Sequence, residues 1–281
     1  MKTHAILAAA LLALGTTATQ AADWSDTALG YRHGSSFAEP FNTSDISKNI
    51  FSLTHASGYK YGSNFFNVDM LLSDKNDPAS VGSTQGAHEV YAVYRHTLDL
   101  EKATGTAFKV GPFRGWGLTA GFDLNTKTDA GYNSKKRMLV LGPTLMVDVP
   151  GFLNISLLLL QESNAPFNGF SQVSTPRYTY KTHPMLGLVW GMPVKLGSVP
   201  LSFEGYANFI ASKGRNEFGV ATATETNIDM QLMVDCSGGR NTFRLGVEYQ
   251  YWRNKFGNAY SGPAGNGAFA KTPMLRAEYH F

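Results

Sequence analysis

Two residues near the N-terminus have the types that acyl-transfer chemistry needs. His33 and Ser35 are two positions apart, so in an extended segment their side chains share one face. A serine beside a histidine base is the minimum for nucleophilic hydrolysis, and Glu39 or Asn42 could supply the orienting partner. The alternative is a polar strand end that leads into a loop. The pair alone does not decide between these interpretations.

Other reactive patterns are scarce in this sequence. Asp74, Asn76 and Asp77 supply part of a calcium-loop pattern without its full spacing, which favours a solvated Asn-Asp-Pro turn. The single cysteine, Cys236, cannot form an internal disulfide, and we interpret it as a turn residue. The sequence has no zinc, phosphate-loop or dinucleotide motif. We therefore expect a protein that is not an enzyme, with no cofactor and no metal.

The first 21 residues have the pattern of a secretory signal peptide. Lys2 and His4 precede an apolar run over residues 5–14, and small residues follow up to Ala21. We predict cleavage after Ala21 and a single domain over residues 22–281. The net charge of +3 and the lack of a basic aromatic patch do not favour nucleic-acid binding. No later apolar stretch is long enough for a transmembrane helix, so a membrane assignment must come from strands.

Period-two alternation of apolar and polar residues recurs along the chain. A β-strand places successive side chains on opposite faces, so each such segment has one apolar and one polar face. Segments of this kind occupy residues 25–35, 48–57, 59–73, 88–98, 116–125, 137–148, 152–162, 178–192, 201–210, 224–235, 242–253 and 272–281. In the seventh, Leu158 and Leu160 interrupt the polar face. The count predicts about twelve strands.

The last segment shows the alternation well. Leu275, Ala277, Tyr279 and Phe281 fall on one face, and the other face carries Met274, Arg276, Glu278 and His280. A terminal Phe281 with Tyr279 two residues earlier resembles the C-terminal signal that the assembly machinery of bacterial outer-membrane barrels reads. We expect Phe281 to contact that machinery.

The lengths of the connections support a barrel. Those near residues 36–47, 74–87, 126–136, 163–177, 211–223 and 254–271 are long, and those between them are short except for Asp99–Pro112. Outer-membrane barrels have long outer loops and short periplasmic turns. Trp116 and Trp190 would lie on the outer face at periplasmic strand ends, as an interfacial girdle requires. The sequence predicts an all-β, antiparallel, up-and-down transmembrane barrel of about twelve strands in the outer membrane.

A barrel of this size leaves a narrow polar interior in which charged groups and rings can contact small solutes. The alternative for each inward residue is pairing with its neighbours to stiffen the wall. The candidate solute-binding residues near mid-strand are Phe65, Asn67, Asp69, Tyr91, Arg95, Asp123, Glu204, Tyr206, Asp229, Arg244 and Glu248.

Residues 45–74 resemble the Tsx-like nucleoside-specific channels of the outer membrane. Residues 59–69, YKYGSNFFNVD, carry most of the likeness: an aromatic-Lys-Tyr-Gly turn, then a strand with paired phenylalanines that ends in Val-Asp. The resemblance implies a monomeric twelve-stranded barrel that passes nucleosides by passive diffusion. An outer-membrane lipid hydrolase that uses His33 and Ser35, and a structural or adhesive barrel, remain the alternatives. Lys135, Lys136 and Arg137 either bind lipopolysaccharide phosphates at the outer rim or form a solvated strand start.

Overall fold

The computed structural model describes residues 22–107, 109–169, 171–197 and 199–281. The predicted signal peptide lies outside these residues. Twelve long strands form the wall: β1 (Trp24–Phe37), β2 (Ile46–Tyr59), β3 (Gly62–Ser73), β4 (His88–Asp99), β5 (Phe113–Lys127), β7 (Arg137–Val147), β8 (Phe152–Asn164), β12 (His183–Leu196), β13 (Val199–Ile210), β14 (Glu225–Asp235), β15 (Phe243–Arg253) and β16 (Phe269–His280).

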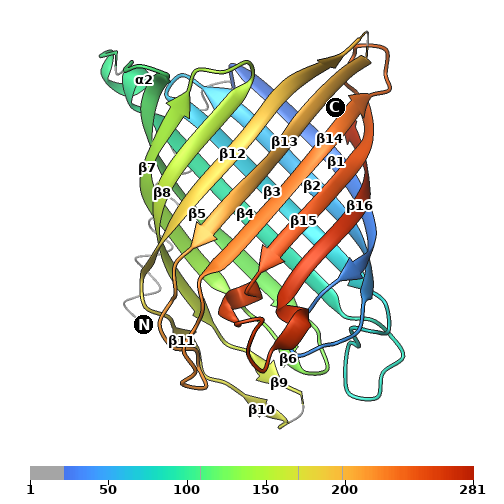
Figure 1. The fold of residues 1–281 in the computed structure, drawn as a ribbon. Helices are drawn as coiled ribbons and strands as arrows, with labels where there is room; N and C mark the ends of the chain where they lie inside the picture. The colour runs from blue at the N-terminus through green and yellow to red at the C-terminus, as the bar shows by residue number, and fades with distance from the viewer. Residues whose placement is uncertain (1–21, 108, 170, 198) are drawn as a thin grey trace.

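Each long strand pairs antiparallel with the next, and the last pairs with the first, so the sheet closes into a barrel (Figure 1). At this seam, residues 28–33 of β1 pair with residues 275–280 of β16, with Leu29 opposite Tyr279. Closure leaves no unpaired edge along the wall, as a lipid environment requires. The expected all-β barrel of about twelve strands is confirmed.

The two ends of the barrel differ. The end that holds the C-terminus carries the short connections and the short helix α2 (Leu100–Thr104), which fills the one longer connection (Figure 1). The opposite end carries the long loops, with the short strands β6 (Tyr132–Asn133), β9 (Phe167–Asn168), β10 (Val173–Ser174) and β11 (Tyr178–Thr179) and the 3₁₀ helices η1 (Lys255–Gly257) and η2 (Gly265–Ala268). We call the long-loop end the outer mouth, because outer-membrane barrels extend long loops outward. In the described ranges, none of the helices has the length and hydropathy to cross a bilayer.

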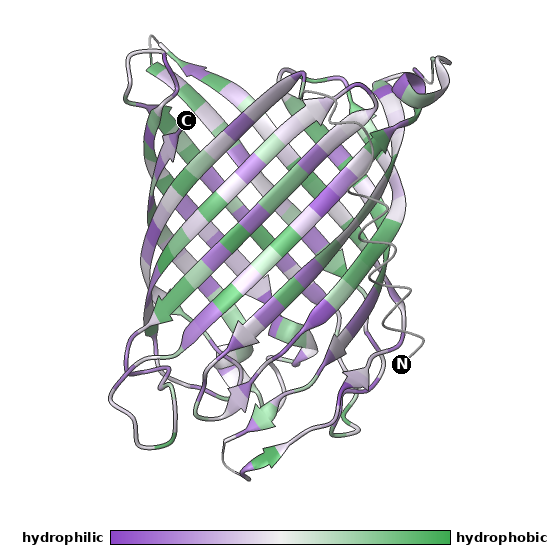
Figure 2. Cartoon of the chain, turned by 180° about the vertical axis from the view of Figure 1, so that it is seen from behind, coloured by the Kyte–Doolittle hydropathy of each residue, from purple (hydrophilic) through white to green (hydrophobic). Residues whose placement is uncertain are grey.

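The outer wall is apolar, as the alternation predicts. On β7, Leu139 and Leu141 are 60% and 54% exposed, whereas the alternate residues Met138 and Val140 are buried inside. Leu275 and Tyr279 on β16 likewise point outward, at 66% and 54% exposure. Figure 2 shows this alternation of apolar and polar positions along the tilted strands. A closed barrel with exposed aliphatic side chains on its outside is an outer-membrane barrel.

Leu158 and Leu160, which interrupt the polar face of β8, have a packing explanation. They form a buried cluster inside the barrel with Met138, Val140 and Met185 from the adjacent strands. A second internal cluster joins Phe37, Ile46, Ile50 and Met274 near the outer mouth. The interior therefore combines apolar packing on parts of the wall with charged groups elsewhere.

Two predictions about β12 need correction. The eighth strand begins at His183 rather than Tyr178, because Tyr178–Thr179 forms the separate strand β11, which pairs with β8 alone. Trp190 faces outward but lies in the middle of β12, where its ring packs on Phe203 with centroids 5.6 Å apart. It is not at a strand end. Trp116, in contrast, is 40% exposed near the periplasmic start of β5.

Candidate functional site in the barrel interior

All eleven candidate residues occupy inward positions. The strand registers place Asp69 opposite Tyr91, Phe65 opposite Arg95, and Glu204 opposite Gln231, and paired residues share a face. The interior placement of Asn67, Asp123, Tyr206, Asp229, Arg244 and Glu248 follows from the same registers. Contact of any of them with a solute stays a prediction.

A belt of ion pairs crosses the middle of the interior on β3, β1, β15 and β16. The guanidinium of Arg32 lies 2.5 Å from Asp69 and 3.2 Å from Glu248. The other Glu248 oxygen lies 2.6 Å from Arg276. Glu248 therefore bridges two arginines from different strands.

The belt continues toward β13 and β14. Arg276 lies 2.6 Å from Glu278, and Arg244 lies 3.4 Å from Glu278 and also pairs with Glu204. Gln231 donates to Glu204 at 3.0 Å. The side chains of Arg32, Glu248 and Arg276 are only 11%, 0% and 13% exposed. Because these charges are packed against one another, side chains narrow the middle of the barrel.

The opposite wall carries a smaller polar group. Arg95 lies 2.5 Å from Asp123, and the Tyr91 hydroxyl donates to the other Asp123 oxygen at 2.7 Å. Phe65 stands opposite Arg95 and is 41% exposed, although it faces inward. Asn67 is used within the wall, because it accepts from Thr54 at 2.7 Å and donates to Asp69 at 2.9 Å. Phe65 is thus a candidate residue with an aromatic face open to the interior.

A second charged group lies at the outer mouth, and we call it the mouth lock. Its centre is Glu39, which the β1–β2 loop carries inward. One Glu39 oxygen lies 2.6 Å from Lys48, 3.2 Å from Lys255 and 3.6 Å from Lys127. Burial alone would raise the pKa of Glu39, but the three ammonium groups outweigh it and hold the pKa well below its usual range.

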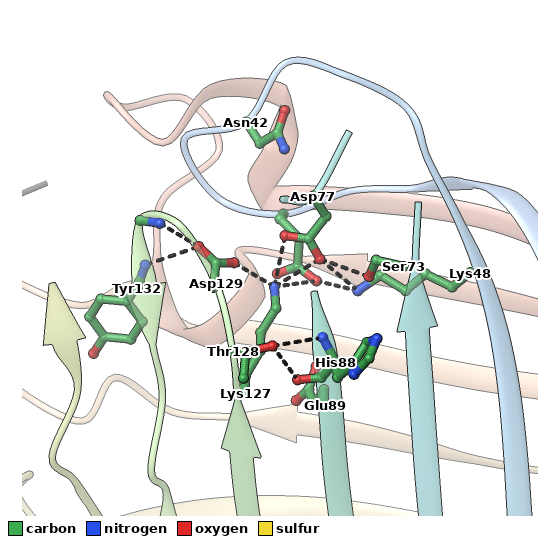
Figure 3. Close-up of polar contacts among 12 residues, drawn as sticks. Asn42, Lys48, Ser73, Asp77, His88, Glu89, Lys127, Thr128, Asp129 and Tyr132 are labelled. Atoms are coloured by element: carbon green, nitrogen blue, oxygen red, sulfur yellow. Dashed lines mark hydrogen bonds and ion pairs between the residues drawn. The ribbon is translucent and has the colours of Figure 1, made fainter. Parts of the chain in front are cut away.

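Asp77 and Asp129 complete the mouth lock from two other loops. Lys127 projects from the end of β5 and lies 3.1 Å from Asp77 and 2.8 Å from Asp129 (Figure 3). Asp77 also accepts from the Ser73 hydroxyl at 2.9 Å. Burial raises the pKa of Asp77 despite the nearby Lys127, and burial likewise lowers the pKa of Lys255 despite Glu39. The lock ties the β1–β2, β3–β4 and β5–β7 loops and η1 to the barrel end.

Neutral hydroxyl groups form a third internal feature. The hydroxyls of Thr97, Thr119, Thr144 and Ser156 lie in a row across β4, β5, β7 and β8, with successive oxygen separations of 2.9, 2.6 and 2.8 Å. Thr119 and Thr144 are buried. This hydroxyl row lies toward the periplasmic end of the interior and carries no charge.

The structure changes the interpretation of His33 and Ser35. Both are exposed on the outer wall, as expected, but neither Glu39 nor Asn42 orients His33. Glu39 is held by the lysines of the mouth lock, and Asn42 donates to the carbonyl of Asn76 at 2.7 Å. Both predicted orienting partners are wrong, because the loop after β1 folds inward. Asn49 on β2 takes that position instead, 3.0 Å from Nδ1 of His33.

The other residues singled out in the sequence make contacts with nearby residues or with solvent. Asp74 accepts from the backbone N–H of Asn76 at 3.0 Å, which is the predicted turn, and Asp77 pairs with lysines. Among the described residues, no group of three or more His, Cys, Asp or Glu side chains is placed to hold a metal ion. Lys136 turns inward to within 3.9 Å of Glu162, whereas Lys135 and Arg137 are exposed. Contact of this basic cluster with lipopolysaccharide stays a prediction. Cys236 is exposed in the β14–β15 connection.

Several functional candidates were missed from the sequence. Arg32, Arg276 and Glu278 occupy inward positions of alternating strands, as Glu248 does. The alternation already assigns Arg276 and Glu278 to a polar face, but none of the three is among the candidate solute-binding residues. The loop residue Glu39 and the 3₁₀-helix residue Lys255 carry no periodic signal. Their roles come from loop folding.

No family model and no curated protein matches this chain. Its structural neighbours include outer-membrane porins and autotransporter translocator domains. The translocator domain of the autotransporter NalP from Neisseria meningitidis is 12% identical with a TM-score of 0.45, covering 99% of this chain and 96% of that chain. A KdgM porin in complex with disordered oligogalacturonate is 9% identical with a TM-score of 0.42, and the NanC porin is 11% identical with a TM-score of 0.40. These two cover 90% and 91% of this chain and 99% of their own chains. Such low values transfer no activity to this chain.

Proposed function

We propose that this protein is a passive outer-membrane channel for small polar solutes, with nucleosides as the first class. The observation that carries the proposal is Phe65, an inward aromatic residue that is 41% exposed beside the polar group of Arg95, Asp123 and Tyr91. A flat base can stack on such a ring, and base–aromatic stacking contributes about 1–3 kcal/mol. The local resemblance of residues 59–69 to Tsx-like channels supports the same class.

The belt of ion pairs supports selectivity for small solutes. Its groups are already paired, so a neutral solute can pass beside them without leaving a buried charge unpaired. Flux would follow the concentration gradient, and no bond is made or broken. We further propose that the protein acts as a monomer, contacts lipopolysaccharide at the outer rim through exposed basic residues, and engages the barrel-assembly machinery through Phe281.

The test is planar-bilayer conductance of the refolded chain, titrated with adenosine, thymidine, a sugar and an amino acid. We expect saturable block by the nucleosides alone. The Phe65→Leu variant should need about tenfold more nucleoside for half-block, since 1.4 kcal/mol is a factor of ten. Phe66→Leu is the matched control, because Phe66 is the neighbouring residue on the outer face. Equal block of both variants, or block by the sugar, would contradict the nucleoside assignment.

A further inference from the structure

The outer wall contains an apolar groove that the channel function does not use. Its volume is about 540 Å³, and it crosses β13, β14, β15, β16 and β1. The strand registers show that one side of it is a single row of outward residues, each paired with the next: Phe203, Leu232, Val247, Leu275 and His33. Tyr249 and Met230 belong to the parallel row on the other side. Because strands in a barrel tilt, this row runs diagonally across the wall, from Leu232 in the periplasmic part of β14 to His33 in the outer part of β1.

The outer end of the groove is polar, unlike the rest of it. His33 and Ser35 both line this end and are exposed. Asn49 Oδ1 lies 3.0 Å from His33 Nδ1 and accepts from the Tyr31 hydroxyl at 2.7 Å. Since an amide oxygen only accepts, Nδ1 of His33 donates to Asn49, which fixes the orientation of the imidazole ring. The end of the groove therefore presents an oriented imidazole and a serine hydroxyl.

A cationic residue follows this polar end in the direction of the outer mouth. Lys271 is an exposed outward residue of β16, two positions toward the outer mouth from Pro273, which lines the groove. Its ammonium lies 4.4 Å from the centre of the Phe269 ring. The sequence of features along the wall is thus apolar groove, hydrogen-bonding groups, then cation. An acylated lipid with a phosphate head has the complementary order of chemical groups.

We propose that this groove is a binding site for one acyl chain of an outer-leaflet lipid A molecule. The chain lies along the row from Leu275 to Phe203, its ester or hydroxyl hydrogen-bonds to His33 and Ser35, and a phosphate pairs with Lys271. The polar end lies in the outer third of the wall, at the level of the headgroups of outer-leaflet lipids, so the bound lipid belongs to the outer leaflet. The site does not depend on a solute passing through the barrel, so its test is independent of the channel.

The experiment is mass spectrometry of lipid retained by the intact protein. The protein is purified from mixed vesicles of hexa-acyl lipid A and phosphatidylglycerol and then transferred to detergent. We expect one lipid A per barrel. Val247→Trp should fill the groove and reduce retention at least tenfold. Leu139→Trp is the matched control, because Leu139 is an equally exposed outward residue on β7.

The polar end is tested by His33→Leu and Ser35→Ala, which should weaken lipid A retention several-fold while conductance through the barrel is unchanged. Equal retention by Val247→Trp and Leu139→Trp would overturn the proposal, as would retention of phosphatidylglycerol in place of lipid A. Loss of an acyl chain from the bound lipid in the unaltered protein, but not in Ser35→Ala, would overturn simple binding in favour of acyl transfer.

Discussion

The belt in the middle of the barrel and the mouth lock both bury charged groups, but they are built differently. Every belt residue comes from a strand, and Glu248 is fixed between Arg32 and Arg276 by the hydrogen-bonded ladder. In the mouth lock, Glu39, Asp77 and Asp129 come from loops that reach back to lysines. The belt is rigid because the wall holds it, whereas the lock itself holds the loops that form it. Loss of a belt charge should therefore destabilise the whole barrel, and loss of a lock charge should release a segment.

The largest effect is expected from Glu248→Ala. The substitution leaves two buried arginines without their shared carboxylate, and breaking a buried pair costs about 3–5 kcal/mol. The measurement is urea unfolding of the protein refolded in lipid vesicles. Glu101→Ala in the short periplasmic helix is the control and should change stability little. If Glu248→Ala lowers the free energy of unfolding by less than about 1 kcal/mol, the strands do not hold the belt arginines rigidly, and the idea of a rigid belt is wrong.

Glu39→Gln should destabilise the protein less than Glu248→Ala does, but should change conductance more. The freed loop can move into water, so the loss is that of charged hydrogen bonds, about 1.5–3 kcal/mol. Single-channel conductance should rise and become noisier, because three lysines lose their common partner. Asp45→Asn in the same loop is the control, because Asp45 is exposed. Unchanged conductance in Glu39→Gln would show that the lock does not restrict the mouth.

The stability difference between the unaltered protein and Glu39→Gln should depend on pH. The pKa of Glu39 is depressed in the folded protein, so its stabilisation is present above the unfolded pKa and is lost as pH falls through the folded value. The stability gap between the unaltered protein and Glu39→Gln should be constant from pH 7 to about 5, and should shrink below about pH 4. Unfolding titrations of both proteins check this. A gap that instead grows on acidification would reverse the assigned sign.

The smallest effect is expected in the neutral hydroxyl row. Thr144→Val keeps the shape of a buried side chain but removes hydrogen bonds to Thr119 and Ser156, at a cost of about 1–2 kcal/mol. The same urea unfolding experiment measures it. Thr126→Val, an exposed position of β5, is the control. A cost as large as that of Glu248→Ala would remove the distinction between charged and neutral internal groups.

The difference between strand residues and loop residues also explains what the sequence could predict. Alternation with period two is imposed by the strand backbone, so Leu139, Glu248 and Asp123 could be assigned to the correct faces without coordinates. Loop residues have no such constraint. Glu39 was considered only as a partner of His33, because its distance from Lys127 and Lys255 depends on how three loops fold together. The orienting role of Asn49 was missed for a related reason, since it depends on the register between β1 and β2.

The pairing of the first strand with the last also affects how the chain matures. Arg32 on β1 bridges Asp69 on β3 and Glu248 on β15, and His280 on β16 lies 2.9 Å from Asp26 on β1. Before β16 joins the sheet, the sheet has two open edges, and several interior charges lack their partners. Both defects disappear in the same event, when β16 meets β1. Barrel closure therefore distinguishes a complete chain from a truncated one. A chain that lacks its last dozen residues would keep sheet edges that can pair with other chains, and its interior would keep charged side chains without partners. Both properties favour aggregation or degradation.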